Sequence, residues 1–347
     1  LQSWLKCPRQ AWLNDFLKLN PIELQDEDID NRTRGLLMHD LEASILSKNG
    51  IPVFSTPLRL SKPLQLLPVS DIETLWQLSL NHLKLESPWL GRKNAVSVHR
   101  CREIIGVNPE IWTQYLEGVT EIEPAGKIFN FLKASIELKD TAPIVCEWGI
   151  STARGKPVVI SGISDEGIKS NFSLSGRIDR VDHLYLPDSK QDGRLVIIRD
   201  MKTVVGPKAK DVGSRHRRAI FDELQLALYA KAWETVYPKD RVIGVGVTEV
   251  GENTEYFVEI DPDYVELVQG LQIGTVTTYT SNTYRQLDEP EPYQSNGFRS
   301  WLEERIRTAI RTVNSANSGL FNPTVSKHCK YCKVRRLCPT SILGGEN

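Results

Sequence analysis

RLVIIRDMKT, residues 194–203, is the stretch of this chain that decides the fold. Its β-branched residues predict a strand. Because side chains alternate along a strand, Asp200 and Lys202 project from one face while Met201 points into the other. The stretch therefore places a carboxylate beside an ammonium group.

A second carboxylate lies in the preceding predicted strand, in GRIDRVD, residues 176–182. If the two strands pair, Asp179 joins Asp200, and two converging carboxylates are the oxygen ligands that Mg²⁺ or Mn²⁺ prefers. Lys202 beside such a metal could position or deprotonate a water molecule, or neutralise charge that develops on a phosphate.

The segments around these strands indicate an α/β sheet with helices on its faces. A helix over residues 219–237 is expected to end before Pro238, and GEN, residues 251–253, connects two further strands as a hairpin. The predicted strands cover residues 143–151, 156–164, 171–186, 194–203, 241–250 and 254–261.

Two predicted helices carry polar residues that could reach the same site. Apolar spacing predicts a helix over residues 33–50, and His39 lies on it. On the helix over residues 219–237, Gln225 and Tyr229 are four positions apart and share a face, where they could form hydrogen bonds near the site. Each feature is common by chance when taken alone, and the order of all of them in one chain gives them weight.

Four cysteines stand at the two ends of the chain. Cys7 is followed by a short predicted helix, and HCKYCKVRRLCP, residues 328–339, holds three more in a C-x2-C-x5-C pattern. Thiolates in such a group are ligands for a tetrahedral zinc ion or for an iron–sulfur cluster, and His328 could replace one thiolate at zinc. If all four bind one centre, the ends of the chain must meet. The four cysteines of this candidate centre are Cys7, Cys329, Cys332 and Cys338.

Composition limits the classes of protein that this chain can belong to. It has 347 residues, 40% hydrophobic residues and a net charge of −1, which suit a globular protein. Its cysteine usage favours a reducing compartment, so we expect a cytoplasmic protein. No apolar run is long enough for a membrane helix, and no phosphate-binding loop of the G-x4-G-K-[ST] type is present, so we expect neither membrane insertion nor ATP hydrolysis.

Taken together, these motifs resemble the RecB-like branch of the PD-(D/E)XK nuclease superfamily, and within it the iron–sulfur members of the AddB type. The matching segments are SWLKCPRQAWL, RGLLMH, GRIDRVD, IIRDMKT, QLALY and the C-terminal cysteine pattern, which span residues 1 to 340. The resemblance implies a restriction-endonuclease-like core, a mixed sheet flanked by helices. It also implies that the chain is the C-terminal nuclease domain of a longer helicase-like protein.

Carried over to this sequence, the resemblance implies a role for each matching residue. Asp179, Asp200 and His39 would bind the divalent metal with help from the carbonyl of Met201, and Lys202 would serve the attacking water. Gln225 and Tyr229 would hold the DNA or support the site. The four terminal cysteines would hold a 4Fe-4S cluster, with zinc as the alternative. Glu147 lies where the family often has a glutamate, but a cross-strand structural role is at least as expected.

The expected organisation is a single nuclease domain in four segments. These are an N-terminal ligand and helix segment (1–50), a helical insertion (51–142), the core sheet and helix (143–262) and the C-terminal helices with the cysteine knuckle (263–347). Within the last segment we expect helices over residues 263–285 and 298–316. The basic loop over residues 202–218 borders the site and is expected to contact DNA phosphates.

The expected function is metal-dependent hydrolysis of DNA phosphodiesters, as an exonuclease or end-processing enzyme on single strands, in double-strand break repair or recombination. The expected partners are DNA and a helicase region, either in the same chain or in a partner subunit. Two alternatives remain open. One is an iron–sulfur-stabilised DNA-binding scaffold without catalysis, and the other is a nuclease of the CRISPR-adaptation type.

Overall fold

The structure is a computed structural model of the whole chain. It describes residues 1–19, 31–68, 109–119, 131–133, 135–136, 141–152, 154–163, 167–184, 193–203, 223–250, 254–261, 263–264, 276–280 and 297–338, with single positions at 70, 71, 74, 77, 81 and 220.

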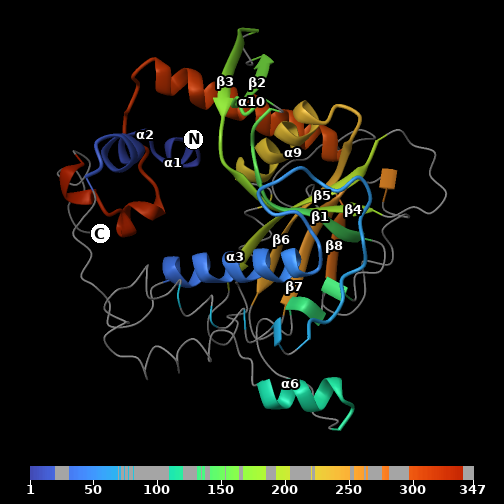
Figure 1. Cartoon of the computed structure of the whole chain (residues 1–347). Coiled ribbons are helices and arrows are strands. Elements are labelled where there is room, and N and C mark those ends of the chain that lie inside the picture. The colour runs from blue at the N-terminus through green and yellow to red at the C-terminus, as the bar shows by residue number, and fades with distance from the viewer. Residues whose placement is uncertain are drawn as a thin grey trace.

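A six-stranded mixed sheet forms the centre of the molecule, in the order β1-β4-β5-β6-β7-β8 (Figure 1). Its neighbours are antiparallel except for the pairs β5–β6 and β7–β8, which are parallel. The α/β class and the predicted pairing of the two acidic strands are therefore confirmed. The strands are β1 (Thr141–Gly149), β4 (Arg177–Leu184), β5 (Leu195–Thr203), β6 (Arg241–Val250), β7 (Thr254–Ile260) and β8 (Val276–Thr280).

Helices lie on both sides of this sheet, with α3 on one side and α9 and α10 on the other (Figure 1). The helix α9 (Gln225–Val236) lies in the connection between the parallel strands β5 and β6, as a crossover requires. Its buried face carries Ala227, Ala230 and Trp233, and the small alanines allow close packing against the sheet. The helix α3 (Asn31–Lys48) has the predicted place, and Gly50 follows it with a φ of 77°.

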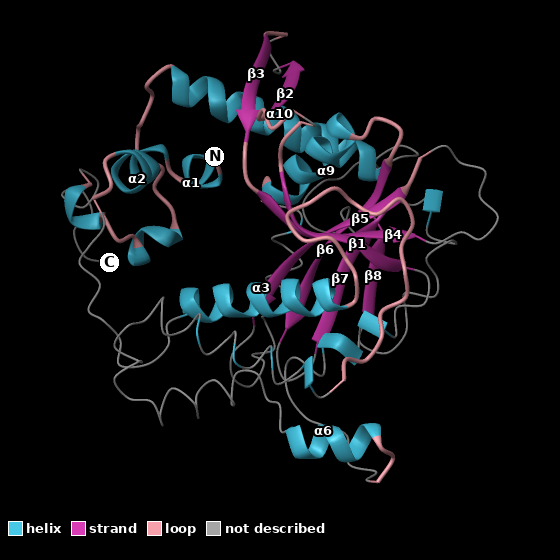
Figure 2. Cartoon of the chain, in the orientation of Figure 1, coloured by secondary structure: helices cyan, strands magenta, loops and turns pink. Residues whose placement is uncertain are grey.

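Two of the predicted strands form a separate sheet. The strands β2 (Val158–Ile163) and β3 (Lys169–Leu174) pair only with each other among the described residues, and this hairpin packs against α9 and α10 (Figure 2). Gly176, with a φ of 149°, separates β3 from β4, so the single strand predicted over residues 171–186 is wrong.

Of the two helices predicted near the C-terminus, the second is confirmed and the first is wrong in its described part. Residues 298–316 are helical, within α10 (Gly297–Asn317). The helix predicted over residues 263–285 is wrong at β8, because the sequence TVTTYT there is dense in the β-branched residues that favour strands. Within the block over residues 51–142, α6 (Pro109–Leu116) is helical, and β1 begins at Thr141, before the expected boundary. Most of that block lies outside the described residues.

The two ends of the chain lie side by side, blue beside red in Figure 1. Cys7 is extended, with a φ of −162°, between α1 (Gln2–Lys6) and α2 (Pro8–Ala11), and a turn of π-helix (Trp12–Phe16) follows. The ring of Trp12 stacks on Phe321, with the centroids 4.7 Å apart. No helix in the described part of the chain is both long and apolar enough to cross a bilayer.

Candidate metal centre and cysteine site

The pairing of β4 with β5 brings the two predicted aspartates together. Arg180 is opposite Arg199 in this pairing, and the backbone N–H of Met201 donates a hydrogen bond to Oδ2 of Asp179 over 2.7 Å. On β5, Nζ of Lys202 lies 2.5 Å from Oδ2 of Asp200. These contacts confirm that the acidic strands are neighbours and that Asp200 and Lys202 share a face.

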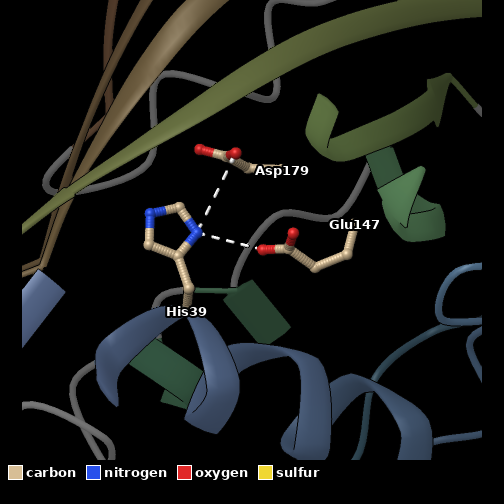
Figure 3. A group of neighbouring side chains, drawn as sticks. All are labelled: His39, Glu147 and Asp179. Atoms are coloured by element: carbon tan, nitrogen blue, oxygen red, sulfur yellow. Dashed lines mark hydrogen bonds and ion pairs between the residues drawn. The ribbon is translucent and has the colours of Figure 1, made fainter. Parts of the chain in front are cut away.

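His39 approaches the same carboxylates from α3 (Figure 3). Its Nδ1 lies 3.0 Å from Oε1 of Glu147 and 3.9 Å from Oδ1 of Asp179. One ligand atom from each of these three residues falls within 4.8 Å of the others, the spacing of a metal site. An imidazole nitrogen with two carboxylates is a donor set that suits a divalent cation of the Mg²⁺ or Mn²⁺ class.

Glu147 is the site residue whose role the sequence left open. It lies on β1 with a φ of 50°, a left-handed conformation that is rare for residues other than glycine. Its neighbour Cys146 packs with Ala43 and Leu46 of α3, and Glu147 also turns towards α3 to contact His39. Consecutive side chains thus face the same side, and the alternation that a sequence pattern relies on fails at this position.

Gln225 and Tyr229 lie beside the metal site as predicted. The side-chain amide Nε2 of Gln225, in the first turn of α9, donates to Oδ1 of Asp200 over 2.8 Å and is 3.2 Å from the hydroxyl of Tyr229. Burial and then the neighbouring carboxylates raise the pKa of Tyr229 to about 12, although the hydrogen bond from Gln225 opposes them. Gln225 therefore orients Asp200 and leaves that carboxylate's second oxygen to Lys202.

The electrostatics of the site show an excess of buried negative charge. Burial and the nearby Asp200 carboxylate raise the pKa of Asp179 to about 7. Burial alone would lower the pKa of His39, but its hydrogen bond to Glu147 and the surrounding carboxylates raise it to about 9. A carboxyl group such as that of Asp179, which resists ionisation beside Asp200, is what a divalent cation would relieve, so these residues fit a metal ion.

Lys202 and Glu42 respond to the same field. Burial opposes the charge on Lys202, but Asp200 and Asp179 raise its pKa above the usual value, so it carries a proton in this state. Glu42, one helical turn beyond His39 and fully buried, has its pKa raised by burial to about 8, while Arg180 opposes the shift. The side of α3 that faces the sheet thus supplies both a candidate ligand and a buried acid.

The strands β4 and β5, which carry the candidate metal ligands, also hold a buried charge cluster that the sequence did not suggest. Asp182 accepts from Nε of Arg180 over 2.6 Å and from Nε of Arg199 over 2.5 Å. Burial alone would raise the pKa of Asp182, but the two guanidinium groups lower it below its ordinary value. Asp182 thus joins Arg180 on its own strand β4 to Arg199 on β5, and the cluster ties these two strands together.

The four terminal cysteines line one small cavity. Cys7 is buried at its wall, and Cys329, Cys332 and Cys338 come from the C-terminal segment around the 3₁₀ turns Lys327–Tyr331 and Arg335–Leu337. The expectation that the ends of the chain meet at the cysteines is confirmed.

Backbone amides point at the sulfur atoms of this cavity. The N–H of Thr324 donates to Sγ of Cys7, and the N–H of Ser326 donates to Sγ of Cys329, both over 3.4 Å. Burial and the other three thiols raise the pKa of Cys332, while a hydrogen bond from the backbone of Val334 opposes them. Four crowded thiols supplied with N–H donors fit a metal centre, which holds thiolates deprotonated and accepts such hydrogen bonds.

The remaining residues of interest are Met201, the basic loop and the two cysteines outside the terminal group. The backbone N–H of Met201 contacts Asp179, and the role of the Met201 carbonyl as a metal ligand stays a prediction. The basic loop predicted to contact DNA lies, over residues 204–219, outside the described residues. Cys146 is a buried thiol in the core next to α3, and Cys101 lies outside the described residues.

Comparison with known proteins identifies the family of this chain. A family model described as the PD-(D/E)XK nuclease superfamily matches residues 1–339. Among solved structures, the crystal structure of SSO0001 is similar with 14% identity and a TM-score of 0.23, covering 53% of this chain. This chain spans 58% of the length of that one. No curated protein matches the sequence.

Proposed function

The chain belongs to the PD-(D/E)XK nuclease superfamily, and from this premise we propose that it is a deoxyribonuclease that hydrolyses DNA phosphodiesters with Mg²⁺ or Mn²⁺. The observation that carries the proposal is the convergence of His39, Glu147 and Asp179 within 4.8 Å, beside the pair Asp200 and Lys202. Membership of the family accounts for the nuclease class, and the site explains how this chain would carry it out.

The residues divide the work of hydrolysis between them. Asp179, Asp200, His39 and Glu147 would hold the divalent metal, with the carbonyl of Met201 as a further ligand. The metal, when bound, supplies positive charge that polarises a phosphate and makes a water molecule more acidic. Lys202, held by Asp200, would orient the attacking water and offset charge on the phosphate. Gln225 keeps Asp200 in place from α9.

We propose single-stranded DNA or DNA ends as the substrate, with exonuclease or end-processing activity in double-strand break repair or recombination. The support is the resemblance of the ordered motifs to AddB-type nucleases, which act with helicases. On the same basis, a helicase region in the same polypeptide or in a partner subunit would deliver the strand.

For the cysteine site we propose a 4Fe-4S cluster. The support is the resemblance of the four-cysteine pattern to that of iron–sulfur nucleases, together with the single cavity that all four thiols line. Zinc is the alternative, because four thiolates are tetrahedral ligands for that ion too.

Cleavage of end-labelled DNA tests the nuclease. We expect single-stranded DNA to be degraded with Mg²⁺ or Mn²⁺ and to remain intact in EDTA, and Asp200→Ala to abolish degradation. Asp71→Ala is the matched control, because Asp71 pairs with Lys48 at the surface and should leave the rate unchanged. If the wild type cleaves no faster than Asp200→Ala, the chain is not a catalyst, and binding without cleavage would identify it as a scaffold.

Anaerobic purification followed by metal and sulfide analysis tests the cluster. We expect four iron and four sulfide per chain, as a 4Fe-4S cluster contains, and their loss in Cys332→Ala. One zinc per chain without sulfide would overturn the assignment, while leaving the nuclease proposal untouched.

A further inference from the structure

An aromatic residue is held open to solvent close to the metal site. Phe54, in the segment after α3, is 62% exposed and has a φ of 52°. Its N–H donates to the carbonyl of Cys146 over 3.2 Å, and the N–H of Cys146 donates to the carbonyl of Pro52 over 3.0 Å. Val53 forms an isolated bridge with Cys146 between these bonds. The segment is therefore fastened to β1 immediately before Glu147.

This conformation places the ring where burial gives it no stabilisation. A left-handed backbone is unfavourable for a residue that has a side chain. A ring that is mostly exposed offsets little of that cost by leaving water. Single exposed apolar residues are common and need no function. Phe54 differs from them because its backbone is strained and because its segment is bonded to β1 beside Glu147, a proposed metal ligand.

Arg177 connects this ring to the metal site. Its guanidinium carbon lies 5.0 Å from the centre of the Phe54 ring, and its Nη1 lies 3.2 Å from Oε2 of Glu147. The side chain of Arg177 is 55% exposed, so its other donors face solvent. One cation therefore touches both a metal-site carboxylate and an exposed aromatic face, and it can still receive a phosphate oxygen.

A groove of about 700 Å³ continues from the ring along the edge of the sheet. Its walls come from the segment that holds Phe54, from the turn after β1 and from the end of α9. Hydroxyl groups and aromatic rings line it, and none of its lining residues in the described part of the chain carries a carboxylate. The lining includes Ser55, Thr56, Ser151, Thr152, Trp148 and Tyr237.

We propose that Phe54, Arg177 and this groove form a subsite for one unpaired nucleotide next to the phosphodiester that is cut. The base stacks on Phe54, and Arg177 contacts the adjoining phosphate. The proposal rests on the proposed nuclease function and specifies its substrate. Phenylalanine forms no hydrogen bond with a base edge, so the subsite accepts any base. A base inside a duplex is already stacked on both faces, so the subsite favours single strands and frayed ends.

The test compares a substrate that has bases with one that has none. Phe54→Ala is expected to lower kcat/KM for a single-stranded oligonucleotide relative to kcat/KM for bis(4-nitrophenyl) phosphate by about 5- to 150-fold. Phe54→Trp should restore the ratio. The matched control is Phe16→Ala, an aromatic that is 75% exposed on the turn beyond α2, which should leave the ratio unchanged. An unaltered ratio in Phe54→Ala would overturn the subsite.

Binding separates this proposal from the nuclease proposal. In an Asp200→Ala background, an oligonucleotide that carries 2-aminopurine at its end is expected to lose fluorescence on binding, and Phe54→Ala should abolish that loss. Arg177→Gln should lower the slope of log affinity against log salt by about 0.7, the value for one phosphate on a single strand. Fluorescence changes that Phe54→Ala preserves would refute stacking even if the enzyme cuts DNA. Wild-type protein that binds with quenching but never cuts would refute the nuclease and retain the subsite.

Discussion

Gln2 and Leu224 are 222 positions apart in the sequence, yet the side-chain Oε1 of Gln2 accepts a hydrogen bond from the backbone N–H of Leu224 over 3.0 Å. Leu224 precedes Gln225, the residue that holds Asp200. The same short helix α1 ends at Cys7, in the wall of the cysteine cavity. The two candidate centres are therefore joined through the five residues of α1 and then through Leu224 and Gln225, which gives the cysteine site a route to the geometry around Asp200.

We expect Cys7→Ala to loosen the whole domain and to slow the nuclease. Loss of this proposed ligand would open a ring that spans nearly all of the chain, and closure of so long a ring strongly restricts the unfolded state. It also frees α1 from its place beside Leu224. Limited proteolysis and the rate of DNA cleavage measure the two effects.

The control for this experiment is Cys146→Ala, which removes a buried thiol that lies in the core next to α3. It should lower thermal stability modestly and leave the iron content unchanged. Equal protease resistance of wild type and Cys7→Ala would show that the N-terminal cysteine is not part of a shared centre.

Asp179→Asn is expected to separate activity from stability. The amide oxygen of the asparagine can still accept the hydrogen bond from Met201. The substitution removes a negative charge that burial and the neighbouring Asp200 disfavour. We expect the rate of cleavage to fall by about 100-fold or more, because losing even a hydrogen-bond partner of a metal ligand costs up to about 100-fold. The melting temperature of the metal-free protein should rise, as calorimetry in EDTA would detect. A lower melting temperature would mean that the carboxylate stabilises the empty site.

Stability of the metal-free protein should fall as the pH rises from 5.5 to 8.5. The pKa values of Asp179, Glu42 and His39 are raised to about 7, 8 and 9. In the unfolded chain these groups release their protons at lower pH, so unfolding releases protons throughout this window and a rising pH favours it. The melting temperature in EDTA, measured across this pH range, should decline.

Addition of Mn²⁺ at pH 8.5 should reverse this decline, because bound cations stabilise the ionised carboxylates. In Asp179→Asn both the decline and the response to Mn²⁺ should be smaller. A melting temperature that increases from pH 5.5 to 8.5 in the metal-free wild type would contradict the electrostatic account of the site.

The periodic parts of this fold could be predicted from the sequence, and so could the part of the site that depends on them. The positions of Asp200 and Lys202 followed from strand alternation alone, and that of His39 from a helical period. Gln225 and Tyr229 were expected to form hydrogen bonds near the site because residues four apart share a helix face, and the structure shows that the partner of Gln225 is Asp200. These residues meet because β4 and β5 pair in the order that the chain suggests.

Other features depend on backbone geometry or tertiary packing that no period reveals. Glu147 enters the site through a left-handed φ, which reverses the side that its side chain faces. The covering of β4 on both sides buries Arg180 and Asp182, which a strand pattern would assign to a solvated face. The strand β8 occupies a segment expected to be helical, because pairing with β7 stabilises β-branched residues there.

The buried cluster around Asp182 gives a final prediction, that Asp182→Asn destabilises the domain without touching the metal site. The substitution leaves the guanidinium groups of Arg180 and Arg199 buried beside a neutral amide. Breaking a buried ion pair in this way typically costs about 3–5 kcal/mol. By contrast Asp71→Asn, which disrupts the more exposed pair with Lys48, should cost less than about 1 kcal/mol. Urea denaturation of both variants measures the difference.

The pH dependence of the stability of wild type and of Asp182→Asn distinguishes a charge effect from a packing effect. Because the pKa of Asp182 is lowered in the folded state, its stabilising contribution is present above the ordinary aspartate pKa and is lost as the pH falls through the lower, folded value. The gap in stability between wild type and Asp182→Asn should therefore be largest near neutral pH and narrow in acid. A gap that is constant from pH 3 to pH 7 would show that Asp182 stabilises β4 and β5 by shape alone, and not by its charge.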